Sequence, residues 1–233
     1  MAFIILLGIV AVLWVLYQIK QARKRKLILA QYMAFSGATR DEILSDKGVS
    51  GEFAIYKLIR ELDLGGYVLA NLYVPYKGAT TEIDLMWIHK TGVYVIESKN
   101  YSGSVYGYED TKNWAQYLGG KKYSFYNPIK QNQTHMNALA ANGVPEEHMQ
   151  SIIVFGAHTT LKKVTVSDAA PPIITLEQLP KLCRKLIRKR KDVYTETEVS
   201  DMANHLFKSY ALASEETKKQ HIERIQEKYG TPV

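Results

Sequence analysis

Two apolar runs joined by a short polar turn constrain the fold of this chain more than any other feature. Residues 83–88 and 93–96 are rich in β-branched and aromatic side chains, and the turn between them is centred on Lys90 and Thr91. This pattern predicts a β-hairpin. With the turn in that position, directly opposed residues have numbers that add up to 181.

Four charged residues interrupt the hairpin on one face. The expected register places Asp84 opposite Glu97 and Glu82 opposite Lys99. Two opposed carboxylates repel each other, so a compensating cation is expected beside them. Mg²⁺ and Mn²⁺ prefer oxygen ligands of this kind, and Lys99 could polarise a metal-bound water or stabilise charge on a phosphate.

The same residues also have a purely structural interpretation. A Glu–Lys pair on a strand is commonly a solvated salt bridge. A slip of one residue in the turn would also break the register and move these side chains to the other face. The hairpin alone therefore leaves both interpretations open.

The N-terminus carries an apolar segment without a charge. Residues 2–19 number 18, which corresponds to a helix of about 27 Å. No basic residue precedes the segment and no small-residue cleavage site follows it, whereas Lys20–Lys26 contains five cations. We therefore predict a single-pass signal anchor in the cell membrane, with the N-terminus outside and everything after it in the cytoplasm.

The net charge of +7 originates in two short segments. Lys20–Lys26 holds five cations and Lys181–Lys191 holds seven, both without an acid, which leaves 18 cations against 23 acids elsewhere. The first segment suits anionic lipid headgroups at the membrane. The second lies on a predicted amphipathic helix and could be a solvated face, a lipid contact or a DNA-binding surface.

The order of the predicted elements indicates an α/β fold, in which a mixed sheet is flanked by helices. Most of the helices and strands lie between residues 49 and 174, and helices alone follow. In chain order the elements are helix 49–62, strand 67–74, the hairpin, a further strand of the meander at 104–108, helix 128–141, strand 151–156 returning parallel, small strands at 164–166 and 173–174, the basic helix, and helices near 196–212 and 214–229.

Local signals add detail to two of these helices. Ser50 is a possible N-cap of the first helix, which would put Glu52 in its first turn, where the helix dipole favours an acid. Gln131 and His135 are four residues apart on helix 128–141 and therefore point the same way.

Aromatic and basic residues alternate between 112 and 126. Trp114, Tyr117, Tyr123 and Tyr126 are interspersed with lysines, a mixture that could stack on nucleic-acid bases. We expect instead that the tyrosines pack half-buried along a hairpin. The single Cys183 excludes an internal disulfide, and no Cys/His pattern suggests zinc.

Taken together, these motifs resemble the NERD (nuclease-related) domain, a branch of the PD-(D/E)xK restriction-endonuclease-like superfamily. Ile83 stands where the superfamily name has a proline. The resemblance covers about 48–141, and its matching pieces are Gly51-Glu52, TEID at 81–84, GVYVIESKNYSGSVYG at 92–107, Trp114, and NPIKQ at 127–131.

The resemblance implies a role for each of five residues. Asp84 and Glu97 would be the metal-binding pair for Mg²⁺ (or Mn²⁺), joined by Glu52 as the accessory acid on the helix. Lys99 would be the catalytic lysine, and Gln131 the glutamine of the following helix. The substrate implied is DNA, while the sequence identifies no protein partner.

We expect one domain of ordinary size with attachments, because the chain has 233 residues of which 46% are apolar. The expected segments are the transmembrane anchor 1–19, a basic juxtamembrane segment and linker 20–47, the nuclease-like domain 48–175, and a helical region 176–233 with the basic helix.

The first hypothesis for function is a membrane-tethered, metal-dependent nuclease that hydrolyses phosphodiester bonds in DNA. The alternative is a catalytically inactive scaffold of the same fold that binds nucleic acid or a protein partner at the membrane. A third hypothesis is an envelope protein whose basic helix contacts lipid and whose acidic face is merely structural.

Overall fold

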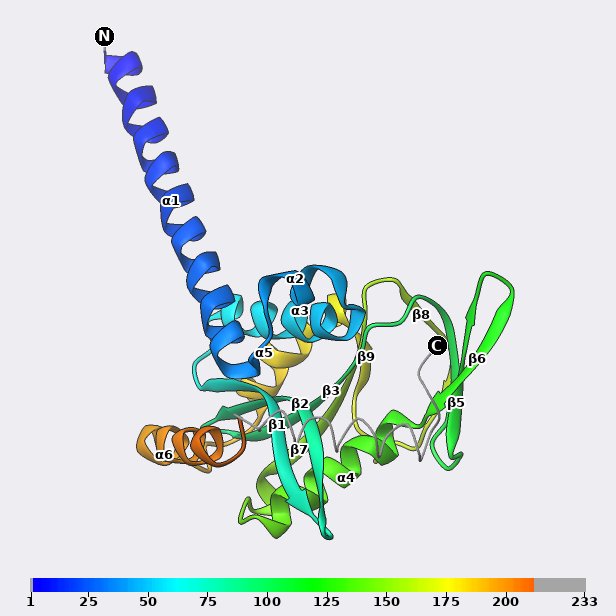
Figure 1. Ribbon diagram of the computed structural model, residues 1–233. Coiled ribbons are helices and arrows are strands. Elements are labelled where there is room, and N and C mark those ends of the chain that lie inside the picture. Colours follow the sequence, from blue (N-terminus) through cyan, green and yellow to red (C-terminus); the bar gives the residue numbers. More distant parts are fainter. Residues whose placement is uncertain (1, 212–233) are drawn as a thin grey trace.

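Two mixed β-sheets organise the chain in the computed structural model, which describes residues 2–211 (Figure 1). The first sheet has the order β1-β2-β3-β7-β9, and the second has the order β6-β5-β4-β8. The strands of the first sheet are β1 (Tyr67–Tyr76), β2 (Ala79–His89), β3 (Gly92–Lys99), β7 (Met149–Phe155) and β9 (Ile173–Thr175). Those of the second are β4 (Gly103–Tyr108), β5 (Asn113–Leu118), β6 (Lys121–Tyr126) and β8 (Thr159–Thr165).

Helices cover both faces of the first sheet. One face packs against α1, α3 and α5, and the opposite face packs against α4 and α6, so β2 and β3 are buried on both sides. The helices are α1 (Ala2–Ser36), α2 (Arg40–Ser45), α3 (Lys47–Leu62), α4 (Pro128–Ala141), α5 (Leu179–Lys189) and α6 (Glu196–Leu206), with short helical turns at Glu146–His148, Leu176–Gln178 and Phe207–Ala211.

The expected register of the central hairpin is confirmed. The β2–β3 pairs run from His89 with Gly92 to Leu85 with Ile96, and every pair adds up to 181. The parallel return strand is also confirmed, because β7 pairs with β3 in parallel after α4. The α/β class predicted from the sequence is therefore correct.

The second sheet differs from the expected continuous meander. Residues 104–108 were expected to be a further strand of the hairpin's meander, but β4 pairs with β5 and β8 instead. The chain turns sharply after β3, where the Tyr101 amide donates to the Lys99 carbonyl. Gly103 follows with a φ of 82°, and an added Cβ there would stand 2.3 Å from the Tyr117 carbonyl oxygen. This turn and the tight pairing direct β4 away from the first sheet.

The start of α3 also differs from expectation. Ser50 was a possible N-cap of this helix, but the Asp46 side chain accepts from the Val49 amide at 2.9 Å and the helix begins at Lys47. Glu52 therefore lies beyond the first turn. The helix expected at 214–229 falls outside the described residues.

The N-terminal helix is continuous from Ala2 to Ser36 and extends away from the rest of the molecule (Figure 1). Its large apolar side chains from Leu6 to Ile19 are exposed, and by length and composition α1 is a candidate membrane span. Its last turns behave differently, because Ile28 and Tyr32 are buried in the core beside α3.

Gly107 is a close-packed position at which the core between the two sheets can be tested. An added Cβ would stand 2.1 Å from the indole ring of Trp114, which is almost fully buried. We expect Gly107→Ala to lower the free energy of unfolding by about 1–3 kcal/mol, because the indole must be displaced. Thermal unfolding of the purified protein in detergent, followed by tryptophan fluorescence, measures the change. Ser104→Ala on the same strand is the control, and equal melting temperatures for the two variants would contradict this packing.

Candidate active site

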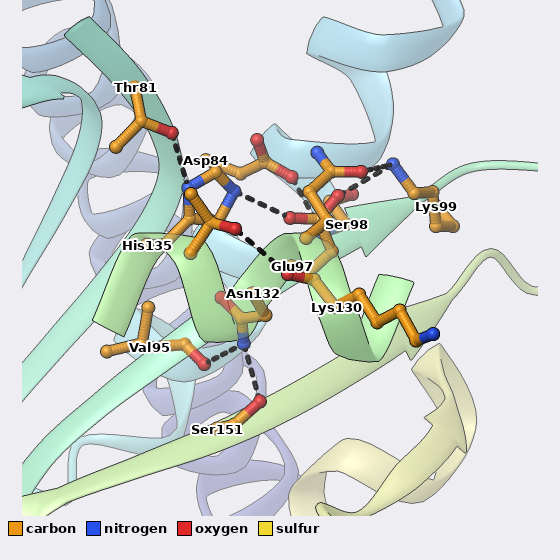
Figure 2. Close-up of polar contacts among 12 residues, drawn as sticks. Thr81, Asp84, Val95, Glu97, Ser98, Lys99, Lys130, Asn132, His135 and Ser151 are labelled. Carbon is orange, nitrogen blue, oxygen red and sulfur yellow. Dashed lines mark hydrogen bonds and ion pairs between the residues drawn. The ribbon is translucent and has the colours of Figure 1, made fainter. Parts of the chain in front are cut away.

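The two central strands separate at the point where their charged residues begin. The last β2–β3 pair is Leu85 with Ile96, and beyond it Asp84 Oδ2 accepts a hydrogen bond from the Ser98 amide at 2.8 Å (Figure 2). Beyond Ile96, β3 continues through Lys99 as the neighbour of β7 alone. The separation leaves room for side chains of Asp84, Glu97 and Lys99 at one end of the hairpin.

Glu97 is fully buried and lies between two basic groups. Its Oε1 is 2.6 Å from Lys99 Nζ, and its Oε2 is 3.0 Å from His135 Nε2 (Figure 2). Because an ionised carboxylate can only accept, His135 Nε2 donates in this contact. The other ring nitrogen of His135, Nδ1, is 2.9 Å from Thr81 Oγ1.

Helix α4 supplies three side chains to this region. Lys99 Nζ donates to Gln131 Oε1 at 3.0 Å, and His135 one turn later contacts Glu97. Asn132 lies between them and fastens the helix to the sheet, donating to the Val95 carbonyl at 2.9 Å and to Ser151 Oγ at 2.8 Å. The expectation that Gln131 and His135 point the same way is confirmed.

Glu52 approaches the cluster from the opposite side, on α3. Its Oε2 accepts from the Tyr32 hydroxyl at 3.2 Å, so the last part of α1 contacts the residue expected to be the accessory acid. Gly51 is needed next to it for a steric reason. An added Cβ at this position would stand 2.5 Å from Asn100 Cβ, directly after β3.

The carboxylates in this region influence one another strongly. Burial, with the charges of Glu82 and Glu97, raises the pKa of Glu52 to about 8. Burial and the charges of Glu97 and Glu52 hold the pKa of Asp84 well above its ordinary value. Without a further cation, Glu52 therefore favours the protonated state near neutral pH, and the pKa of Asp84 is shifted in the same direction.

Glu97 and Lys99 form the charged pair of the cluster. Burial alone would raise the pKa of Glu97, but Lys99 and His135 outweigh it and hold that pKa below its ordinary value. Burial would likewise lower the pKa of Lys99, but the Glu97 carboxylate raises it above the ordinary value instead. Both groups are therefore ionised near neutral pH.

The oxygen donors of Asp84 and Glu97 fit a divalent cation of the magnesium type. Glu97 Oε1 is buried and accepts no hydrogen bond of ordinary geometry. Burial, together with the charges of Glu97 and Glu52, raises the pKa of Asp84, and a cation would offset both effects. Mg²⁺ is commonly held by one or two carboxylates, with waters and phosphates completing its octahedron. Among residues 2–211, however, no group of three or more His, Cys, Asp and Glu side chains is placed to hold a metal. A third ligand from Glu52 stays a prediction.

Most of the residues expected at the site lie in one cluster. Asp84, Glu97, Lys99 and Gln131 are brought together, whereas Glu82 accepts from the Tyr73 hydroxyl of β1 at 2.8 Å instead of lying opposite Lys99. Sequence reasoning missed Tyr32, Thr81 and Asn132. Thr81 belongs to the TEID piece at 81–84, but its role, like those of Tyr32 and Asn132, depends on contacts between distant segments.

An α/β fold with an Asp, a Glu and a Lys at the end of its central hairpin agrees with the nuclease-like class expected from the sequence. Residues 47–156 match the model of the nuclease-related domain family, NERD. The chain therefore contains a nuclease-related domain, and the matched segment holds every residue of the cluster described above except Tyr32.

Two further comparisons found proteins with partial similarity to this chain. An uncharacterized protein of Bacillus anthracis is 28% identical over 211 residues, which is 88% of this chain and 95% of that protein. The structure of Can2 from Sulfobacillus thermosulfidooxidans, solved in complex with cyclic tetra-adenylate, is 18% identical with a TM-score of 0.35. This match covers 60% of the present chain but only 37% of Can2, and it is too weak to assign a function.

The contact between Tyr32 and Glu52 yields a prediction about stability. Tyr32→Phe removes the hydroxyl and keeps the ring. We expect it to lower the free energy of unfolding by about 1–3 kcal/mol, because Glu52 loses a hydrogen-bond partner. Tyr32→Ala also removes the buried ring and should cost about 3–5 kcal/mol. Thermal unfolding of the full chain in detergent, followed by near-UV circular dichroism, measures both.

Tyr17→Phe is the matched control for this experiment, because Tyr17 lies on the same helix with its side chain exposed. It should unfold as the unaltered protein does. A Tyr32→Phe variant as stable as the Tyr17→Phe variant would show that the hydroxyl contact contributes nothing.

Proposed function

We propose that this protein is a membrane-tethered, metal-dependent nuclease that hydrolyses phosphodiester bonds in DNA on the cytoplasmic side of the membrane. The observation that carries the proposal is the convergence of Asp84, Glu97 and Lys99 within the segment that matches the nuclease-related domain. Two acids and a lysine on a rigid, doubly covered sheet are suited to phosphoryl chemistry.

Asp84 and Glu97 would hold the metal ion in this proposal. A bound Mg²⁺ or Mn²⁺ supplies a Lewis acid that lowers the pKa of water and offsets charge on the phosphate. Asp84 is oriented for this by the Ser98 amide, and Glu97 by His135, so neither carboxylate has to reorganise when substrate arrives. Glu52, on α3, would be the accessory acid.

Lys99 would act on the phosphate or on the attacking water. Its ammonium group is charged near neutral pH and is only slightly exposed, so its field acts on a phosphate oxygen with little screening. Gln131 fixes the direction of this group through the 3.0 Å hydrogen bond. The role of Gln131 is thus to position Lys99.

The tether in this proposal is the exposed apolar part of α1, which ends at Ile19. Lys20–Lys26 follows directly and would lie at the cytoplasmic surface, where anionic headgroups favour it. Within that segment Lys24 Nζ is 3.7 Å from Asp63 Oδ2 at the end of α3, so the domain is held close to the end of the span.

Cleavage of plasmid and single-stranded DNA by the purified full chain in detergent tests the proposal. We expect cutting with Mg²⁺ or Mn²⁺, none with EDTA, and a fall of about 100-fold or more for Lys99→Ala and for Asp84→Asn. Lys99→Ala removes a cation that would act on the phosphate, and Asp84→Asn weakens a ligand that would hold the metal ion. Gel assays of nicking and of oligonucleotide length measure the rates.

Lys130→Ala is the matched control. Lys130 neighbours Gln131 on α4, but its side chain points away from the cluster and donates to the Asp110 carbonyl (Figure 2). Its loss should leave the cleavage rate unchanged. Cutting that survives in Lys99→Ala would remove this residue from the mechanism. No cutting and no metal binding at Asp84 and Glu97 would favour the inactive scaffold.

The tether makes a separate prediction about truncated chains. The full chain should stay with membranes after a carbonate wash, whereas a chain beginning at Lys20 should be soluble and keep its near-UV circular dichroism, because Ile28 and Tyr32 remain. A chain beginning at Ala34 should lose that spectrum, since it lacks both core residues. Release of the full chain by carbonate would contradict the anchor.

A further inference from the structure

The outer face of the second sheet carries exposed tyrosines. Along β4, Val105 and Gly107 point inward to the buried Trp114, so Tyr106 and Tyr108 point outward and are 36% and 44% exposed. Tyr117 on β5 is 42% exposed. Of the tyrosines between 112 and 126 that were expected to pack half-buried, Tyr123 and Tyr126 do so, whereas Tyr117 is exposed.

These tyrosines form an ordered row with two lysines. The rings of Tyr106 and Tyr117 lie 5.3 Å apart at their centroids. Lys122 is directly opposite Tyr117 in the β5–β6 pair, and Lys163 is opposite Tyr106 in the β4–β8 pair. Lys163 Nζ also stands 5.8 Å from the centre of the Tyr108 ring. The row of lysine, tyrosine, tyrosine and lysine crosses all four strands.

The charge of this sheet is of one sign. Its four strands contain four lysines and no acidic residue. The candidate active site has the opposite character, because it brings three acids, Glu52, Asp84 and Glu97, together beside Lys99. Affinity for a polyanionic substrate must therefore come from another surface, and the second sheet follows directly after β3, which bears Lys99.

We propose that the outer face of the second sheet binds single-stranded DNA, with Tyr106, Tyr108 and Tyr117 stacking on bases and Lys122 and Lys163 contacting phosphates. Exposed aromatic rings flanked by cations on an open sheet are suited to this, because each unstacked base offers a flat face to a ring. A duplex hides those faces. The inference rests on the proposed function and adds that the DNA substrate is single-stranded.

The position of the surface is well defined. Its inner side packs on Phe155 of the first sheet through Trp114 and Phe125, and Gln116 Nε2 donates to the Ser102 carbonyl at 2.7 Å in the segment that joins β3 to β4. The outer face therefore points away from the first sheet. In this proposal the outer face holds one part of the DNA strand, and a neighbouring part of the same strand reaches Lys99.

Fluorescence anisotropy of labelled oligo(dT) with the full chain in detergent and EDTA tests this, because EDTA prevents cleavage. We expect Tyr106→Ala and Tyr117→Ala each to weaken binding by about 5- to 100-fold, the effect of losing one stacked base. Tyr106→Phe keeps the ring and should bind as the unaltered protein does. Lys122→Ala and Lys163→Ala should each reduce the slope of log affinity against log salt by about 0.7.

Tyr67→Ala is the control, since Tyr67 on β1 is equally exposed, at 42%, but lies on the other sheet. Equal binding by the Tyr106, Tyr117 and Tyr67 variants would overturn the inference. So would competition by duplex or by oligo(rU) stronger than that by oligo(dT). Loss of binding in Tyr106→Phe as well would assign the effect to misfolding of the sheet and would also overturn it.

The two proposals can fail separately. Absence of cleavage, with oligo(dT) binding that depends on Tyr106 and Tyr117, would reject the nuclease and keep the surface. Metal-dependent cleavage with an unchanged KM in both tyrosine variants would keep the nuclease and reject the surface.

Discussion

The buried charge of Glu97 is the constraint on which the rest of this structure depends. An ionised carboxylate without water costs several kcal/mol unless partners surround it. Lys99 and His135 provide those partners, and they come from the end of β3 and the middle of α4. One electrostatic arrangement therefore links three features. They are the ends of β2 and β3, the position of α4 on the sheet and the direction of the Lys99 ammonium group.

The second consequence of this arrangement is that the cluster has more acidic groups than its cations compensate. Glu97 is compensated, while Asp84 and Glu52 have raised pKa values because they share the same poorly solvated region. Such strongly perturbed acids beside a buried lysine are typical of functional sites more than of structural salt bridges. The structural interpretation of the Glu97–Lys99 pair as a solvated salt bridge is excluded, because Glu97 is fully buried.

The parts of the fold that follow from local patterns could be predicted from the sequence. Alternation and the turn at Lys90 and Thr91 yielded the hairpin register, and helical spacing placed His135 beside Gln131. The separate second sheet could not be foreseen, because the pairing of β4 with β8 joins segments more than fifty residues apart and leaves no local trace. The choice between Asp46 and Ser50 as N-cap is of the same kind, because both residue types cap helices and only the three-dimensional path of the chain selects one.

The unbroken course of α1 has a consequence for where the protein could act. From Ile19, at the proposed membrane boundary, to Tyr32, beside Glu52, the helix rises about 20 Å at 1.5 Å per residue. If α1 spans a membrane as proposed, a helix of that length would hold the domain at a fixed height above it, as a flexible linker would not. The catalytic groups would sweep a thin layer parallel to the bilayer, so the protein would encounter only those nucleic acids that come to the membrane.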